Sequence, residues 1–249
     1  MPTVHLLGTG AVRSDPDRTT TMLAATNDEG TLLIDCGGDV APRLEAVGID
    51  PTRLEALIVT HEHADHVAGL PLLMERLWLM GRRTPLPVYG IAPAIAQVHR
   101  VHDAFDVEAW EGYPGLEVHE VAQHPGAEVL HRAGWRVTAA PGTHAVPSVG
   151  LRLEDEASGR VLGYSGDTAP DPRIAELVRG ADLLLHEATG EGPVHTGAAE
   201  AAGIARDANV GRLILVHVPP RDVRADDVAA ARAAFPGTTV GDELQGVPF

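Results

Sequence analysis

Lysine is absent from the sequence, and arginine supplies all 19 basic residues against 35 acidic ones. The net charge of −16 makes the chain a poor general binder of nucleic acid, because Lys and Arg neutralise phosphate backbones with release of counterions. The one visible basic cluster consists of Arg76, Arg82 and Arg83. We interpret this cluster as a solvated helix end rather than as a nucleic-acid patch.

Cysteine is nearly absent too. Cys36 stands alone, which excludes an internal disulfide and fits a reducing cytoplasm. No apolar stretch is long enough to span a membrane, and the N-terminus lacks the basic segment and cleavage pattern of a signal peptide. The chain also has no repeat, linker or charge block that would mark a domain boundary. We therefore expect a cytoplasmic protein without membrane association, folded as a single domain over residues 1–249.

Hydrophobic residues make up 44% of the chain, which is enough for a sizeable core. Strand patterns cover residues 4–7, 21–25, 31–35, 57–60, 88–89, 116–121, 135–140, 149–153, 161–165, 183–186, 213–216 and 238–240. Helix patterns cover residues 40–47, 67–79, 93–105, 172–179, 197–207 and 225–234. Strands lead into helices in both halves of the chain. This order predicts an α/β fold, a four-layer αββα sandwich of two mixed sheets with outer helices.

The densest polar motif is His-Glu-His-Ala-Asp-His at residues 61–66. It offers four potential metal ligands, namely His61, His63, Asp65 and His66. Imidazole nitrogen and carboxylate oxygen suit Zn²⁺, Mn²⁺ or Fe²⁺. The motif lies between a buried-strand pattern and an apolar, helix-length segment, a junction at which open α/β sheets place their sites. One metal seldom needs all four ligands, so the spacing favours a paired metal site over a solvated polar loop.

Three more ligand-type residues, His144, Asp167 and His217, each follow a predicted strand. A single histidine at a strand end is usually an ordinary polar terminus, and a Gly-Asp-Thr sequence is usually an Asx-type turn. Together with residues 61–66, however, the three give seven ligand-type residues that are expected at the same edge of the sheets. This combination favours a metal centre.

In this order, residues 61–66, His144, Asp167 and His217 resemble the metallo-β-lactamase superfamily over nearly the whole chain. The resemblance implies an αββα sandwich and a centre of two divalent metal ions, zinc in the first place, with manganese and iron as alternatives. Asp167 would bridge the two ions, and an aspartate there favours the hydrolase branches over the β-lactamases themselves. The implied ligands are His61, His63 and His144 for the first ion, and Asp65, His66 and His217 for the second.

Two further motifs, His-Glu-Ala-Thr at residues 186–189 and His-Thr at 195–196, resemble the ribonuclease Z group of phosphodiesterases. In that group the glutamate and the second histidine form a proton-relay pair, which implies catalytic roles for Glu187 and His195. The alternatives are a carboxylate bonded at a strand end and a helix-entry residue. The resemblance also implies that Asp65 orients the nucleophile and that Asp35 orients the metal site from behind its ligands. Gly-Thr-Gly at residues 8–10, with Arg13 and Arg18, is similar to the group's N-terminal loop.

The chain departs from ribonuclease Z where that group inserts its tRNA-gripping arm. His144 and Asp167 are only 23 residues apart, and the interval reads as a strand, a turn at residues 155–159 and a strand. The segment after His217 reads Val-Pro-Pro-Arg, with Arg221 at a matching place. We therefore expect a small or cyclic phosphodiester as the substrate. We also expect a homodimer, and tRNA 3′ processing remains the alternative if a partner chain supplies the missing grip.

Two other functions stay open, a metallo-hydrolase of another ester class and a non-catalytic metal-binding module. The segment 105–131 has little clear pattern. Its Trp110 and Tyr113 could line a base-stacking pocket, but aromatic residues are only 4% of the chain and cores need them. We therefore favour a packing role for these two side chains.

Overall fold

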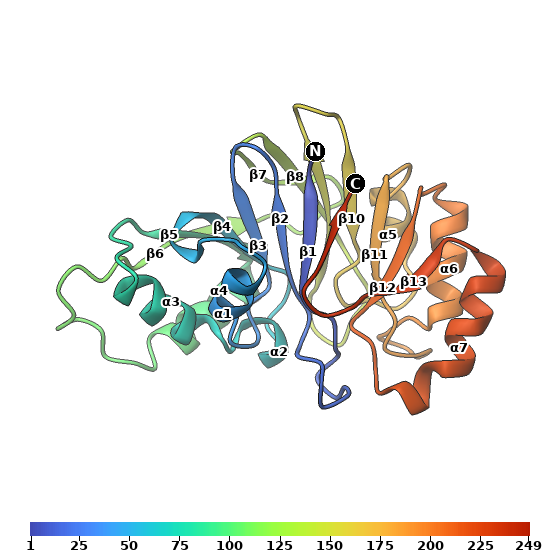
Figure 1. Ribbon diagram of the computed structural model, residues 1–249, viewed down its shortest axis with the longest axis horizontal. Helices are drawn as coiled ribbons and strands as arrows, with labels where there is room; N and C mark the ends of the chain where they lie inside the picture. The colour runs from blue at the N-terminus through green and yellow to red at the C-terminus, as the bar shows by residue number, and fades with distance from the viewer.

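The computed structural model describes the backbone of residues 1–249 and the side chains of residues 1–221 and 227–249. Its strands form two seven-stranded sheets, with α1–α4 beside the first and α5–α7 beside the second (Figure 1). Both sheets contain parallel and antiparallel pairs. The predicted αββα sandwich of two mixed sheets is therefore confirmed.

The first sheet has the order β14-β1-β2-β3-β4-β5-β6, and β3 to β6 are parallel, so their carboxyl ends meet at one edge. Its strands are β1 (Thr3–Gly8), β2 (Met22–Thr26), β3 (Thr31–Ile34), β4 (Leu54–Val59), β5 (Leu86–Ile91), β6 (Leu116–Val121) and β14 (Gln245–Pro248). Its helices are α1 (Ala41–Ala46), α2 (Ala64–Val67), α3 (Leu70–Leu79) and α4 (Ala92–His102), with a 3-10 turn η1 (Pro51–Arg53).

The second sheet has the order β13-β12-β11-β10-β9-β8-β7, and β10 to β13 are parallel. Its strands are β7 (Ala127–Arg132), β8 (Trp135–Pro141), β9 (Val149–Asp155), β10 (Val161–Tyr164), β11 (Leu183–Glu187), β12 (Leu213–Val216) and β13 (Thr238–Val240). Its helices are α5 (Pro172–Leu177), α6 (Ala198–Asp207) and α7 (Arg221–Ala234). The β9–β10 hairpin is the predicted strand, turn and strand, so the short interval between His144 and Asp167 holds no inserted arm.

Helix α6 lies close to the second sheet because its buried face is made of alanine. Ala198, Ala201, Ala202 and Ala205 are all buried, at the i, i+3, i+4, i+7 spacing of one helix face. Small side chains let the helix axis approach the strands. The first turn is held by Glu200, whose carboxylate accepts a hydrogen bond from the Gly197 amide at 2.9 Å. His195, two residues before Gly197, is thereby placed at the carboxyl edge of the second sheet.

One helix was predicted over residues 67–79, but the structure has two, α2 and α3, because the helix is interrupted at Gly69. The Gly69 amide donates to the Cys36 carbonyl at 2.8 Å, and a Cβ on Gly69 would lie 2.0 Å from the Gly38 carbonyl oxygen. Only glycine allows this approach of two backbones. Residues 64–67 therefore form the separate turn α2, which carries Asp65 and His66.

Strands β7 and β14 were not predicted from the sequence.

The interpretation of the arginine cluster as a solvated helix end is wrong for Arg82. Arg76 is exposed and paired with Asp39 at 2.7 Å. Arg82, by contrast, is buried, because its guanidinium donates to backbone carbonyls around the entry to β4 and the loop before β5. Those carbonyls belong to Thr52, Leu54, Thr84 and Pro85.

The aromatic residues of segment 105–131 pack on each other. Trp110 stacks on Trp78 of α3 with ring centroids 4.9 Å apart, and Tyr113 meets Trp110 edge-on at 5.7 Å. The His102 Nε2 lies 3.0 Å from the Tyr113 hydroxyl. These contacts fit the packing role that we favoured, and the same two side chains, Trp110 and Tyr113, also line a cavity of about 170 Å³.

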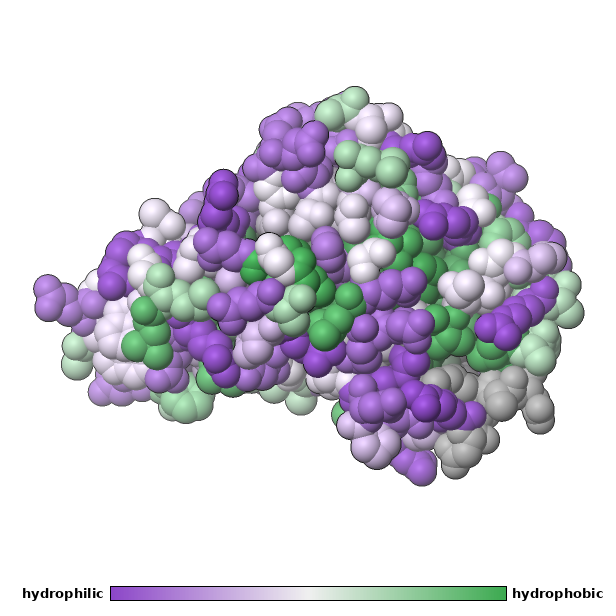
Figure 2. Space-filling view, viewed as in Figure 1, coloured by the Kyte–Doolittle hydropathy of each residue, from purple (hydrophilic) through white to green (hydrophobic). Residues whose placement is uncertain are grey.

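Hydrophilic residues cover most of the face shown in Figure 2, including the loop between β1 and β2 at its lower edge. Ion pairs join this loop to the start of α7, where Arg221 lies 2.7 Å from Asp17 and 3.5 Å from Asp15. No helix in the described part of the chain has the length and apolarity needed to cross a membrane.

Candidate metal centre

Three imidazoles converge where β4 and β8 end. His61 and His63 follow β4, and His144 follows β8. The His61 Nε2 lies 3.1 Å from the His63 Nδ1, which lies 3.2 Å from the His144 Nε2. One cation could take all three nitrogen atoms as ligands. The first predicted ligand group is thus brought together from both sheets.

A second group gathers beside the first. Asp65 and His66 lie on α2, and His217 follows β12. The Asp65 Oδ2 lies 3.7 Å from the His66 Nε2 and 3.3 Å from the His217 Nε2. These three residues can also hold a metal ion.

Asp167 joins the two groups. Its Oδ2 lies 3.9 Å from the His61 Nε2, 3.6 Å from the His66 Nε2 and 3.3 Å from the His217 Nε2. Its Oδ1 and the His66 Nε2 are buried without any hydrogen-bond partner among the described residues. Buried polar atoms are rarely left unpaired, so these two atoms fit a site that a cation completes. All seven predicted ligands lie at this one place.

Four of the imidazoles are fixed through the nitrogen that faces away from the centre. In each, the Nδ1 contacts an oxygen acceptor, which favours a proton on Nδ1 and leaves Nε2 as the atom that faces the centre. Neutral imidazole with a bare nitrogen is the form that binds a metal. The contacts are His61 to the Thr60 hydroxyl at 3.1 Å, His66 to Asp35 at 2.8 Å, His144 to the Val194 carbonyl at 2.9 Å, and His217 to the Thr189 hydroxyl at 2.8 Å.

Asp35 lies behind the candidate ligands, where the family resemblance placed it. It is buried, and its backbone φ of 59° is unusual for a residue other than glycine. Its carboxylate accepts from the Thr60 amide at 2.8 Å and contacts the His66 Nδ1. Burial alone would lower the pKa of His66, but the carboxylates of Asp167 and Asp35 outweigh burial and hold that pKa well above its usual value. A cation at the His66 Nε2 would take the place of the proton held there.

The other pKa shifts at the centre also suit ligand chemistry. Burial lowers the pKa of His61 and of His144, which keeps both imidazoles neutral. Burial would raise the pKa of Asp167, yet the neighbouring His217 and His66 outweigh it and hold this pKa well below its usual value. These shifts favour the forms of His61, His144 and Asp167 that coordinate a divalent ion.

Glu187 and His195 form the predicted pair at the rim of the centre. Glu187 is fully buried, and its carboxylate accepts from the Thr168 amide at 2.9 Å and the Thr189 amide at 3.0 Å. The His195 Nδ1 lies 2.8 Å from the Glu187 Oε1. This hydrogen bond raises the pKa of His195 against the opposing effect of burial. The His195 ring lies 4.9 Å from the His144 ring, so its other nitrogen lies at the centre.

Three supporting groups were missed by the sequence analysis. The Thr189 hydroxyl and the Val194 carbonyl fix two imidazoles, and the Thr21 hydroxyl accepts from the His217 amide at 3.1 Å. Thr189 closes the His-Glu-Ala-Thr motif, which was a usable signal. The Val194 carbonyl has no side-chain signature, and Thr21 is 196 residues from its partner, so neither contact could be found locally.

Gly166 shapes the turn that presents Asp167, and we expect Gly166→Ala to destabilise the protein and lower its metal content. Its φ is +58°, and an added Cβ would lie 2.4 Å from the Val149 carbonyl oxygen. Gly159→Ala is the matched control, because Gly159 has a φ of +69° with nothing within 4 Å of the added Cβ. The control should cost about 1–2 kcal/mol of unfolding free energy. Urea unfolding and metal analysis would contradict this account if the two variants behaved alike.

Comparison with known proteins extends these observations. The family model of the β-lactamase superfamily domain matches residues 31–218. Ribonuclease Z of Methanothermobacter thermautotrophicus is 31% identical, over 99% of this chain and 96% of the relative. Ribonuclease Z of Mycobacterium marinum is also 31% identical, over 98% and 97%. The metallo-β-lactamase fold protein YhfI from Bacillus subtilis shares the fold, with a TM-score of 0.84 over both whole chains at 22% identity.

Proposed function

Because the chain belongs to the metallo-β-lactamase superfamily, in its ribonuclease Z-like branch, we propose that it is a dinuclear metal-dependent phosphodiesterase of small or cyclic phosphodiesters, folded as one domain over residues 1–249. The protein is a metal-dependent hydrolase of phosphoester bonds. One observation carries the finer proposal. The paired ligand groups, joined by Asp167, lie beside the hydrogen-bonded pair Glu187 and His195.

Each of the two ligand groups would hold one divalent ion. Divalent ions, with zinc expected first and manganese or iron as alternatives, would supply a water of lowered pKa and neutralise charge on the phosphate oxygens. Asp167 would contact both ions, and its unpaired Oδ1 and its Oδ2 suit that role. One group consists of His61, His63 and His144, and the other of Asp65, His66 and His217.

The chain's own residues would perform the proton chemistry. Asp65 lies between His66 and His217, where its carboxylate can orient the attacking water. Glu187 holds the His195 Nδ1, so the His195 Nε2 can face the substrate with a proton. The hydrogen bond to Glu187 raises the pKa of His195 and so favours the form that carries this proton. His195 would then stabilise the charge on the phosphate or protonate the leaving alkoxide oxygen.

The proposed substrate is small for two reasons. The hairpin of β9 and β10 fills the interval between His144 and Asp167, so no arm extends there to grip a folded RNA. The net charge of −16 also disfavours a long polyanion. The second candidate is tRNA 3′ processing, which the names of the curated relatives favour. In that case a homodimer would have to supply the grip.

A parallel substrate assay tests the proposal. Metal-reconstituted protein is offered bis-p-nitrophenyl phosphate, 2′,3′- and 3′,5′-cyclic nucleotides, 3′-extended pre-tRNA, and chromogenic carboxylic and sulfate esters. We expect hydrolysis of the first phosphodiester and of at least one cyclic nucleotide. Cleavage of pre-tRNA with inactive cyclic nucleotides would establish the second candidate. Activity confined to other esters would overturn phosphodiester chemistry, and inactivity of the metal-loaded protein on every substrate would indicate a non-catalytic module.

A further inference from the structure

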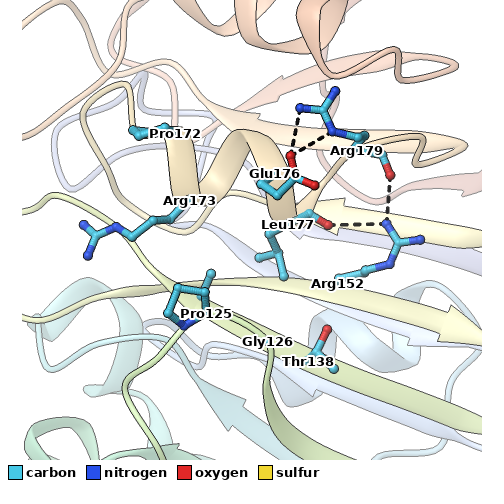
Figure 3. A pocket seen from close by; sticks show the side chains of 10 residues that line it. Pro125, Gly126, Thr138, Arg152, Pro172, Arg173, Glu176, Leu177 and Arg179 are labelled. Atoms are coloured by element: carbon cyan, nitrogen blue, oxygen red, sulfur yellow. Dashed lines mark hydrogen bonds and ion pairs between the residues drawn. The ribbon is translucent and has the colours of Figure 1, made fainter.

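A cavity of about 790 Å³ opens beside helix α5, over strands β8 and β9 of the second sheet (Figure 3). None of its lining residues is a candidate ligand of the metal centre. Its volume lies in the range of small-molecule sites, which are mostly apolar with a few polar groups that fix orientation. Apolar wall is supplied by Pro125, Ala140 and Leu177. The charged residues of the wall are three arginines and one glutamate, namely Arg152, Arg173, Arg179 and Glu176.

Arg152 gives the cavity an uncompensated positive charge. Its side chain rises from β9, and one guanidinium nitrogen donates to the Leu177 carbonyl at 3.3 Å and the Arg179 carbonyl at 3.1 Å (Figure 3). Within residues 1–221 and 227–249, no carboxylate forms an ion pair with Arg152. Two carbonyls hold the guanidinium in position but do not neutralise it, so its remaining N–H donors stay available to a ligand.

The other two arginines are each paired with a carboxylate. Arg173 lies 2.6 Å from Asp171, and Arg179 lies 2.8 Å from Glu176. The side chains of both arginines are about half exposed, at 43% and 54%. Arg173 is held by a bidentate pair with the buried Asp171. The Arg179–Glu176 pair is exposed on both sides and therefore weak, so the Arg179 guanidinium can turn part of its donor set toward a bound anion. Counted with Asp171 and Glu176, the three arginines leave one net positive charge at the cavity, in a chain of net charge −16.

We propose that this cavity is a second binding site, for an organic phosphomonoester. Guanidinium groups present planar pairs of N–H donors that match phosphate oxygens, and phosphate offers three such oxygens to donors from several sides. Arg152 contacts the phosphate, and Arg179, whose backbone carbonyl Arg152 already contacts, lies beside it. The organic body of the ligand lies on Pro125 and Leu177. The site is separate from the metal centre and does not depend on what that centre hydrolyses.

The test titrates metal-loaded protein with phenylphosphonate, whose C–P bond resists hydrolysis, and with inorganic phosphate, by calorimetry. The metal centre can also bind either probe, so variants identify the second site. Arg152→Gln and Arg179→Gln should each weaken one binding event for phenylphosphonate by roughly tenfold, since each removes a charged hydrogen bond. Glu176→Gln should strengthen the same event, a gain that loss of folding cannot produce. Inorganic phosphate, which lacks a body for the apolar wall, should bind there more weakly.

Arg206→Gln is the matched control, because Arg206 is an exposed arginine paired with Asp207 outside the cavity. It should bind both probes as the wild-type protein does. The proposal is overturned if the two cavity arginine variants and Glu176→Gln bind phenylphosphonate with wild-type affinity and stoichiometry. Equal affinity of the second site for both probes would overturn the organic character of the ligand.

Discussion

Asp167→Ala should abolish turnover and metal loading together. The Asp167 carboxylate is the group that reaches His61, His66 and His217 at once, and it is almost fully buried. Without it, buried imidazoles from both ligand groups lose the negative charge that offsets a cation between them. Charge stabilisation by bound metal is worth several kcal/mol, so we expect a rate loss of roughly 1,000-fold or more. Metal analysis beside the bis-p-nitrophenyl phosphate assay measures both effects.

Asp155→Ala is the matched control for the loss of a buried carboxylate. Asp155 is 3% exposed and accepts hydrogen bonds from Asn27 and Ser158, at the β9–β10 turn away from the metal centre. This variant should lose stability yet bind metal and turn over substrate when folded. The assignment of Asp167 fails if Asp167→Ala retains its metal, or if Asp155→Ala loses metal to the same extent.

His195→Ala should keep its metal while losing roughly 10²–10⁴-fold in rate on substrates with an alkoxide leaving group. Its Nδ1 is bound by Glu187, so only its other nitrogen remains for substrate, whereas the seven proposed ligands are complete without it. A merely structural role would lower the rate on every substrate equally. A proton donor matters less when the leaving group is stable as an anion. The loss on bis-p-nitrophenyl phosphate should therefore be much smaller than the loss on a cyclic nucleotide.

His131→Ala provides the comparison for removal of a histidine elsewhere. His131 is half exposed and paired with Glu156 at 2.8 Å. This variant should match the wild-type protein in metal content and in both rates. Full activity of His195→Ala on cyclic nucleotides would refute the relay assignment. Loss of metal from His195→Ala would instead make His195 a ligand, which its position near His144 and Asp167 also permits.

The candidate site could be predicted from the sequence because its polar residues follow the regular patterns of hydrophobic residues that mark the strands. His61, His144 and His217 each follow a run of apolar residues at the carboxyl end of a strand, and the αββα order predicts that these ends meet. The fold class was predictable for the same reason. Periodicity marks strands and helices, and the two halves repeat one order of elements.

The details that escaped prediction depend on contacts between distant segments. The break between α2 and α3 follows from the approach of Gly69 to the Gly38 backbone, which no local pattern encodes. His217 takes a φ of +49° although it is not a glycine, because Thr21 and Thr189 hold it from other segments. Arg82 has the sequence context of a surface charge, but two of its carbonyl acceptors, Thr52 and Leu54, lie about 30 residues away in the chain.

Strand β14 has a consequence for how the molecule assembles. Its residues 245–248 follow the whole second half of the chain, yet they pair with β1 at the edge of the first sheet. During synthesis the first sheet therefore lacks one strand, and β1 stays unpaired on that side, until the residues after the whole second sheet have left the ribosome. Pairing across such a separation in sequence is slow, and an open strand edge invites contact with other chains. The period before β14 docks is thus the time when a nascent chain is most exposed to aggregation.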